Sequence, residues 1–406
     1  MTEALSHLKV LDVTHQIAGP YCTKLLADLG AEVIKIEKPG EGDVTRRLGP
    51  FPNDLPHPEK SGLFLYLNTN KKSITLNLKT VQGKQIFKDL VKDTDVLVEN
   101  FEPRVMSDLG LNYEILEQIN PKLVMTSISN FGQTGPYRDY KATELNLAAL
   151  GGPMYLTGNL EREPLKEPGS VFQFAAGADG CTATLAATLY QARSGIGQHI
   201  DLSIMETVVA CMAHHPISWG RSRITTKRRG PYGLASAWPN PIAHSGIYPC
   251  KDGHVLVAVH NQEGLTMLAP LTGHEEITDE SRFRCLGFGK IIGADELSKI
   301  LLDSLKDRNK EELFHSAQEL RLFWTSVKTI EDVFKWDQYK ERKFWVDIDH
   351  PIAGKLTYAR TPFLLKGSPA RFGRAPLLGE HNEEIYREHL GFTKEEMVQL
   401  TSNNII

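Results

Sequence analysis

Strand and helix patterns alternate through residues 9–129, and this alternation restricts the possible folds more than any other property of the sequence. Short apolar runs typical of strands occur at 9–14, 32–37, 95–100 and 122–129, with helical patterns after the first strand and at 82–92 and 113–119. Strands that alternate with helices form βαβ units, which build a parallel sheet with helices on both faces. The sequence therefore predicts an α/β fold with a parallel sheet.

The pattern changes beyond residue 220. A basic, glycine-containing stretch at 221–233 is typical of a linker, and two apolar runs within 247–259 flank Asp252-Gly253, which is a hairpin signal. Helical patterns follow at 263–271, 294–305 and 310–320. Because 406 residues exceed one ordinary hydrophobic core, we expect three parts: a large domain at 1–224, a smaller α+β domain at 225–330 and a C-terminal segment at 331–406.

Composition and local patterns exclude several classes of protein. A formal net charge of −4 gives no overall attraction for nucleic acid or for an anionic membrane, and no stretch approaches the ~18 apolar residues of a membrane span. The five cysteines are scattered without C-x-x-C spacing, which predicts reduced thiols and a cytoplasmic location. His214 and His215 lack the i, i+4 spacing of a metal pair, so no metal site is predicted.

Cationic and amide side chains follow several of the predicted elements, at the kind of edge where open α/β sheets bind ligands. They are Lys35, Lys38, Asn70, Lys71, Lys72, Asn100, Arg104, Arg138 and Lys141. Lysines and helix N-termini bind phosphate, so this set fits a phosphate-bearing ligand, and the alternative is that these are solvated loop charges. The first turn, Ala18-Gly19-Pro20, lacks G-x-G-x-x-G, which argues against a standard NAD site.

Several spaced motifs carry a resemblance to a known family. They are Leu11-Asp12-Val13-Thr14-His15, Ala18-Gly19-Pro20, Leu29-Gly30-Ala31-Glu32-Val33-Ile34-Lys35-Ile36-Glu37, Asn70-Lys71-Lys72-Ser73-Ile74, Val98-Glu99-Asn100-Phe101, Gly195-Ile196-Gly197-Gln198 and Ala375-Pro376-Leu377-Leu378-Gly379-Glu380-His381. With these motifs in order, the chain resembles the family III CoA-transferases, which include the formyl-CoA, carnitine and benzylsuccinate CoA-transferases and the related α-methylacyl-CoA racemases.

The resemblance implies a large Rossmann-like domain completed by the C-terminal segment, a smaller domain, and two subunits interlocked like links of a chain. It also implies coenzyme A or an acyl-CoA as substrate, with a carboxylic acid as the second substrate, and no covalently bound cofactor. The implied contacts are His15 and Ala18 in the CoA groove, Lys38 and Asn70 to Lys72 at the nucleotide end, and Asn100, Phe101 and Lys141 along the pantetheine path. Asp108 stands where the family often has an arginine, and Arg104, one turn earlier, could replace it.

One position separates this chain from its implied relatives. Transferases of the family use an Asp that attacks the acyl-CoA thioester and forms first a mixed anhydride and then an aspartyl-CoA thioester. Counting back from Gly177, and independently from Gln198, puts Gln173 at that position. A carboxamide has no ionised oxygen, so this residue cannot take the covalent route. We expect Gln173 to lie where a strand-like apolar segment passes into a helix of small residues.

Three hypotheses follow. In the first, the chain is the non-catalytic subunit of a heteromeric CoA-transferase whose homologous partner subunit carries the Asp, with succinyl-CoA and benzylsuccinate as one candidate pair of substrates. In the second, it is an active homomer in which Glu144 or Asp179 performs the acyl-CoA chemistry. A racemase-like site lacks its proton-shuttling histidine, because Thr143 stands in that place. In the third, it is a CoA-binding regulatory protein without chemistry.

Overall fold

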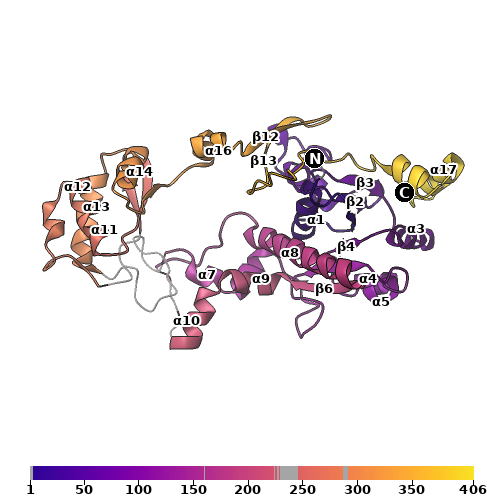
Figure 1. Ribbon diagram of the computed structural model, residues 1–406, viewed down its shortest axis with the longest axis horizontal. Coiled ribbons are helices and arrows are strands. Elements are labelled where there is room, and N and C mark those ends of the chain that lie inside the picture. Colours follow the sequence, from indigo (N-terminus) through magenta and orange to yellow (C-terminus); the bar gives the residue numbers. More distant parts are fainter. Residues whose placement is uncertain (1–2, 160, 224, 226–227, 229–245, 287–290) are drawn as a thin grey trace. The chain divides into compact units, whose positions relative to one another are not determined.

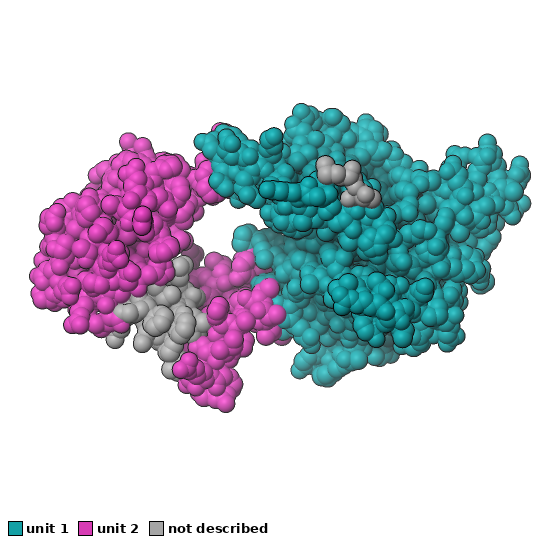
Figure 2. Space-filling view, viewed as in Figure 1, with its two compact units in different colours: residues 1–147, 168–208, 337–406 teal, residues 148–167, 209–336 magenta. Residues whose placement is uncertain are grey.

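The computed structural model describes residues 3–159, 161–223, 225, 228, 246–286 and 291–406 (Figure 1). Two compact units divide the chain, one comprising residues 1–147, 168–208 and 337–406 and the other 148–167 and 209–336 (Figure 2). The boundaries expected from the sequence, at 224 and 330, therefore both lie within the second unit.

The first unit is built on a six-stranded sheet in the order β3-β2-β1-β4-β5-β6, and all of its strand pairings are parallel. Its strands are β1 (Lys9–Asp12), β2 (Glu32–Glu37), β3 (Lys72–Thr75), β4 (Val96–Glu99), β5 (Val124–Ser129) and β6 (Gln198–Ser203). The chain adds strands outward from β1 to β3, then returns beside β1 and continues outward to β6. This doubly wound arrangement confirms the predicted α/β fold, and the order reverses between β1 and β4.

Helices cover both faces of this sheet. The helices of the unit are α1 (Ala18–Asp28), α2 (Gly62–Leu67), α3 (Val81–Val91), α4 (Val105–Leu109), α5 (Tyr113–Leu116), α8 (Val171–Ser194), α16 (Asp337–Glu341) and α17 (Lys394–Ser402), with short 3₁₀ turns at Val44–Arg47 and Pro52–Asp54. Two further helices, α6 (Glu144–Leu150) and α9 (Ile204–Cys211), begin in this unit and end in the second. On one face, α8 packs along α1 and against β5 and β6 (Figure 1). Gly177 of α8 permits this approach, because a Cβ atom there would lie 2.6 Å from the Ala18 carbonyl oxygen.

The opposite face carries a core that joins distant parts of the chain. Leu11 and Leu97 of the sheet pack there with Phe87 of α3 and with Ile385 and Leu400 from the C-terminal segment. The segment also pairs with the edge strand β3, since the His381 N–H donates to the Ser73 carbonyl at 2.9 Å and the Tyr386 hydroxyl to the Thr75 carbonyl at 2.6 Å. The C-terminal residues thus protect an edge strand and complete a hydrophobic core.

The C-terminal segment contains a hairpin and two helices. It forms an antiparallel hairpin of β12 (Trp345–His350) and β13 (Gly354–Ala359), and then a π-helix, η4 (Glu383–His389). The helix α17 follows. A capping box of Thr393 and Glu396 starts it, which is a local signal that the sequence does contain.

The second unit has its own core around a three-stranded antiparallel sheet, β11-β8-β7. Its strands are β7 (Gly246–Cys250), β8 (Gly253–Val257), β9 (Arg284–Cys285), β10 (Ile291–Ile292) and β11 (Thr325–Ser326), and its helices are α7 (Pro153–Leu156), α10 (His214–Ser222), α11 (Gln262–Thr266), α12 (Leu268–Thr272), α13 (Ala294–Leu305), α14 (Lys310–Glu319) and α15 (Ile330–Lys335), with a 3₁₀ turn at Glu275–Thr278. The predicted hairpin is present, whereas the helix expected at 263–271 divides into α11 and α12. Most of the linker expected at 221–233 lies outside the described residues.

Among the helices of the described residues, none combines the length and apolar character needed to cross a membrane.

Candidate functional site

A cavity of about 820 Å³ opens at the carboxyl edge of the sheet in the first unit. The residues that follow four strands line it: His15 to Ile17 after β1, Asn100 to Val105 after β4, Asn130 after β5 and Ile204 after β6. In doubly wound sheets, ligands bind outside the carboxyl ends of the strands where the strand order reverses, which here lies between β1 and β4. We therefore take this cavity as the candidate site.

A reciprocal pair of hydrogen bonds joins the two central loops. The His15 N–H donates to Asn100 Oδ1 at 2.9 Å, and Asn100 Nδ2 donates to the His15 carbonyl at 2.7 Å. The His15 ring lies 5.5 Å from the Phe101 ring, centroid to centroid. Burial lowers the pKa of the His15 imidazole, which keeps the ring neutral near pH 7. The two loops are therefore fixed to each other, and the histidine that lines the cavity is uncharged.

A buried network of charges lies beneath the loop that follows β1. Lys71 Nζ donates to Asp12 Oδ2 at 2.9 Å, and Lys35 Nζ pairs with Asp43 Oδ2 at 2.9 Å and donates to the Thr14 carbonyl at 2.8 Å. Burial lowers the pKa of Lys71 to about 8, although Asp12 acts in the opposite direction. These groups hold the backbone from residue 14 onward, so they support the site without facing its cavity.

Glu99 lies directly behind the wall that Phe101 forms. Its Oε2 accepts the Phe101 N–H at 2.8 Å, and its side chain also binds Ser127, whose hydroxyl lies 2.8 Å from His199 Nε2. Burial raises the pKa of the Glu99 carboxyl to about 7, against the lowering effect of these two hydrogen bonds. The backbone of the wall is thus held by a carboxyl group that titrates near neutrality.

The N-terminus of α8 brings Gln173 to the cavity. The sequence interpretation of a strand passing into a helix is wrong in detail, because α8 already begins at Val171 and Gln173 lies in its first turn. The Ser170 side chain does not cap this helix; instead Glu144 Oε1 accepts the Phe172 N–H at 3.0 Å. A carboxylate from α6, 28 residues earlier, therefore fixes the helix start that presents Gln173.

The two alternative carboxylates lie in different surroundings. Glu144 lines the cavity, and in the part of the chain that the structure describes its buried Oε2 has no hydrogen-bond partner. Asp179 is not among the lining residues, and its Oδ2 accepts the Thr207 hydroxyl at 2.9 Å. Thr143, at the racemase histidine position, donates to Asn146 Oδ1 at 2.8 Å. Of the two, only Glu144 is placed to meet a ligand in this cavity.

The structure brings five of the predicted contact residues together around the cavity: His15, Asn100, Phe101, Arg104 and Lys141. Arg138, which the sequence analysis noted as a cation after a strand, lines it as well. The carboxylates Glu102 and Asp139 lie beside these cations and were missed. Because only cationic and amide side chains were sought after each strand, these two acids were overlooked, although they lie in the same two loops as the cations.

The remaining predicted contacts lie elsewhere. Lys38 is exposed beyond β2 and pairs with Glu41, and Ala18 is buried at the start of α1. Lys71 is 4% exposed and bound to Asp12, and its role as a ligand contact stays a prediction. Lys72 pairs with Glu32 and Glu384.

Asn70 is also used within the protein. It bonds to Asp28 and to the Arg371 carbonyl and accepts the Gly373 N–H. The motif from Asn70 to Lys72 therefore holds the N-terminal and C-terminal segments of the unit together.

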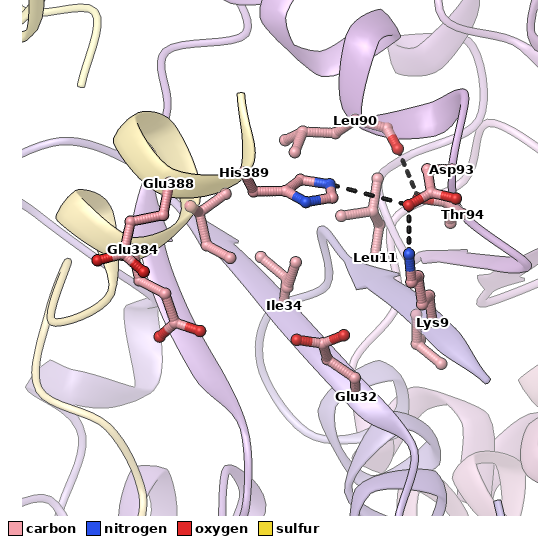
Figure 3. A pocket seen from close by; sticks show the side chains of 12 residues that line it. Lys9, Leu11, Glu32, Ile34, Leu90, Asp93, Thr94, Glu384, Glu388 and His389 are labelled. Atoms are coloured by element: carbon pink, nitrogen blue, oxygen red, sulfur yellow. Dashed lines mark hydrogen bonds and ion pairs between the residues drawn. The ribbon is translucent and has the colours of Figure 1, made fainter. Parts of the chain in front are cut away.

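A smaller cavity of about 280 Å³ lies at the amino ends of β1 and β2, beside η4 (Figure 3). Lys9 and His389 both point toward Asp93, and the His389 Nε2 to Asp93 Oδ2 distance is 4.0 Å. Glu32, Glu384 and further acids complete an anionic lining. Among the described residues that line this cavity, none lies in the loops directly after β1 to β6, which distinguishes it from the candidate site.

Comparison with known proteins places this geometry in context. The model of CoA-transferase family III matches residues 5–382. The chain is 32% identical over 387 residues to the succinate–glutarate CoA-transferase of Agrobacterium fabrum, with 95% of each chain covered. It is 31% identical to the formyl-CoA:oxalate CoA-transferase of Streptomyces avermitilis, with both chains fully covered. The succinyl-CoA–L-malate CoA-transferase beta subunit of Chloroflexus aurantiacus is also 31% identical, with 100% and 98% coverage.

Solved structures agree with the sequence comparisons. A CAIB/BAIF family protein from Brucella suis has a TM-score of 0.83 at 30% identity, covering 96% of this chain and 100% of that one. A hypothetical protein from Mycobacterium tuberculosis has a TM-score of 0.79 at 26% identity, covering 94% and 99%.

Proposed function

This chain belongs to CoA-transferase family III, and we propose that within the family it is the subunit that lacks the nucleophile in a heteromeric enzyme. The enzyme would move CoA from an acyl-CoA to a carboxylic acid. This chain would supply the scaffold and a CoA groove, and a homologous partner subunit would supply the attacking carboxylate. Acyl-CoA and acid would be substrates, with no cofactor attached to the chain.

The observation that carries the proposal is the amide of Gln173 in the candidate cavity. In the covalent route, a carboxylate oxygen attacks the thioester carbonyl, the C–S bond breaks and CoA leaves as the thiolate. The thiolate then attacks the mixed anhydride, which releases the donor acid and forms a thioester on the protein. Gln173 has no anionic oxygen for the first step, while His15, Asn100 and Phe101 still form the groove beside it.

A second subunit is supported by the surface of α8 and by one relative. Val171, Thr182, Ala186 and Leu189 are all exposed, and their spacing puts them on one face of the helix. The Chloroflexus relative is by name one subunit of its enzyme. We propose that this face contacts the partner subunit in an interlocked dimer. The dimer then has one pocket without the nucleophile, in this chain, and one pocket with it, in the partner subunit.

For the substrates we propose succinyl-CoA as donor and a dicarboxylic acid as acceptor. The names of the relatives include succinate, glutarate, L-malate and oxalate. Benzylsuccinate belongs in the same series of acceptors to be tested. Since all of these acids share the carboxylate chemistry, a panel of acids with one donor would rank them directly.

The decisive experiment compares three preparations: the chain alone, the chain co-expressed with a homologue that has Asp at the equivalent position, and the Gln173→Asp variant alone. We expect no turnover from the first and turnover from the second. The third should gain activity, and hydroxylamine should trap an acyl group at position 173. Full activity from the unmodified chain alone would reject the proposal. CoA binding without activity in all three would favour the regulatory alternative.

A second candidate function rests on the unpartnered Oε2 of Glu144 in the cavity. If Glu144 performs the chemistry, the chain alone turns over acyl-CoA, and mass spectrometry finds the adduct on Glu144. Glu144→Gln keeps an acceptor for the Phe172 N–H and should remove this activity without unfolding α8. Asp179→Asn serves as the comparison, because Asp179 does not line the cavity and is bound to Thr207.

A further inference from the structure

Two ion pairs join two of the loops that line the candidate cavity, and the cation of each pair comes from a different loop. Arg104, in the loop after β4, binds Asp139 in the loop after β5 through Nε at 3.1 Å and Nη2 at 2.7 Å. Lys141 of the second loop pairs with Glu102 of the first. We call these four residues the clasp. All of them line the cavity.

Asp139 also binds a second guanidinium. Arg138 Nε and Nη2 donate to its two carboxylate oxygens, each at 3.1 Å. Hydrogen bonds from Arg138 and Arg104 lower the pKa of Asp139 to about 2. The backbone of Arg104 has φ +87°, a left-handed conformation that is strained for a residue with a side chain, at the N-cap position just before α4. One carboxylate is therefore shared by two arginines that line the cavity.

The clasp and Arg138 together leave one net positive charge at the cavity. Three cations, Arg104, Arg138 and Lys141, face two carboxylates, Glu102 and Asp139. The Arg104 side chain is 62% exposed and that of Asp139 47% exposed, so a dissolved anion can reach the contact. Phosphate presents oxygens to guanidinium in the same two-pronged geometry as a carboxylate and carries more charge. An entering phosphate and Asp139 would compete for the same donors.

We propose that Glu102 and Asp139 act as built-in competitors for the phosphate groups of the CoA substrate, and that they set the affinity of the site. This inference rests on the proposed function for the identity of the ligand. When CoA binds, its phosphate oxygens replace Asp139 at Arg104 and Arg138 and replace Glu102 at Lys141, and the two loops separate. This assigns Lys141 to a phosphate group instead of the pantetheine path that the family resemblance implies. A ligand without phosphate groups forms no ion pairs with these cations to replace the ones that would be lost, so it does not separate the two loops.

The test measures CoA binding by calorimetry for the unmodified chain and for Asp139→Asn, Glu102→Gln and the double variant. Each single change removes a competing charge and leaves the cations in place, so CoA should bind roughly three- to tenfold more tightly, and more tightly still with both changes. Asp89→Asn is the matched control, since it removes the carboxylate of the Lys92–Asp89 surface pair on α3. Its affinity for CoA should equal that of the unmodified chain.

The outcomes separate this inference from the proposed function. If Asp139→Asn binds CoA no more tightly than Asp89→Asn, or more weakly, then Asp139 positions the arginines and does not compete, and the inference is rejected while CoA binding stands. If none of the variants binds CoA although circular dichroism finds all of them folded, the proposed function fails and the inference fails with it.

Discussion

Glu99 places an ionisable carboxyl group in the interior of the sheet, directly behind the pocket wall. It is 3% exposed, and it holds the Phe101 N–H on one side and Ser127 on the other. His199, at the end of this chain of contacts, stacks on Tyr113 with a centroid distance of 5.5 Å. Protonation of Glu99 would weaken the acceptor of the Phe101 N–H, so the shape of the wall and the pH are linked.

The direction of the pH effect follows from the raised pKa. Glu99 titrates near 4.5 in the unfolded chain and near 7 in the folded one, so its favourable contribution is complete below pH 4.5 and is lost as the pH rises through about 7. Glu99→Gln should therefore raise the free energy of unfolding at pH 8 by up to about 3 kcal/mol and have little effect at pH 4.5. Urea unfolding at several pH values measures this, with the exposed Glu117→Gln as control. Equal stabilisation at both pH values would contradict the assignment.

For single residues, the sequence predicts the part of the fold in which a residue lies better than it predicts the residues that it contacts. Asn100 was expected from its place after a strand and His15 from the family resemblance, and both line the cavity. The burial of Lys71 was not foreseen, because it depends on Asp12, 59 residues away across the sheet. The effect of Asp139 could not be anticipated either, since its partner Arg104 lies in a different loop.

Among the helices, α1 and α8 depend on their close approach. A Cβ atom on Gly177 would lie 2.6 Å from the Ala18 carbonyl oxygen and 3.0 Å from Tyr21 Cδ1. A Cβ atom on Gly180 would instead meet the end of the Ile128 side chain at 3.1 Å, which can move. The two glycines thus occupy the same helix but differ in what surrounds them.

The pair provides a matched test. Gly177→Ala should destabilise the protein by about 1–3 kcal/mol, because overpacking against backbone outweighs the gain of about 1 kcal/mol in helix propensity. Gly180→Ala should be neutral or slightly stabilising. Denaturant midpoints of the two variants give the comparison, and a Gly177→Ala protein as stable as Gly180→Ala would show that the helices can separate at low cost.

The start of α8 illustrates why element boundaries escape sequence analysis. Val171, Phe172 and Phe174 are typical of a strand, and local preference alone favours that interpretation. Glu144 decides otherwise by accepting the Phe172 N–H from outside the segment. The long periodic elements were located well for the opposite reason, since their apolar spacing and their burial agree.

At the scale of the whole molecule, the exposed apolar face of α8 predicts an assembly. Leu189 is 56% exposed in the isolated chain, so Leu189→Glu should change its stability by less than about 0.5 kcal/mol and should prevent association with the partner subunit. Light scattering after size-exclusion chromatography reports the mass. Val81→Glu, at an apolar position of α3 that is 85% exposed, should leave association intact. Normal assembly of the Leu189 variant would exclude this face from the interface.

The fold class followed from the alternation of elements, because each βαβ unit admits few arrangements. The division into units did not, since residues 148–167 join a unit whose other residues begin at 209. A change in composition along the chain can reveal a linker, but it does not reveal which distant segments pack into the same core.

The core shared by β1 and the C-terminal segment also governs when the protein can fold during its synthesis. About 180 residues separate the end of β6 from the start of η4, from 203 to 383. At roughly 5–20 residues per second, a ribosome needs about 10–40 s to make them. During that interval the apolar face that Ile385 and Leu400 later cover stays exposed. The N-terminal strands therefore leave the ribosome first, but this face of theirs is buried last. A holding chaperone would find its binding surface there.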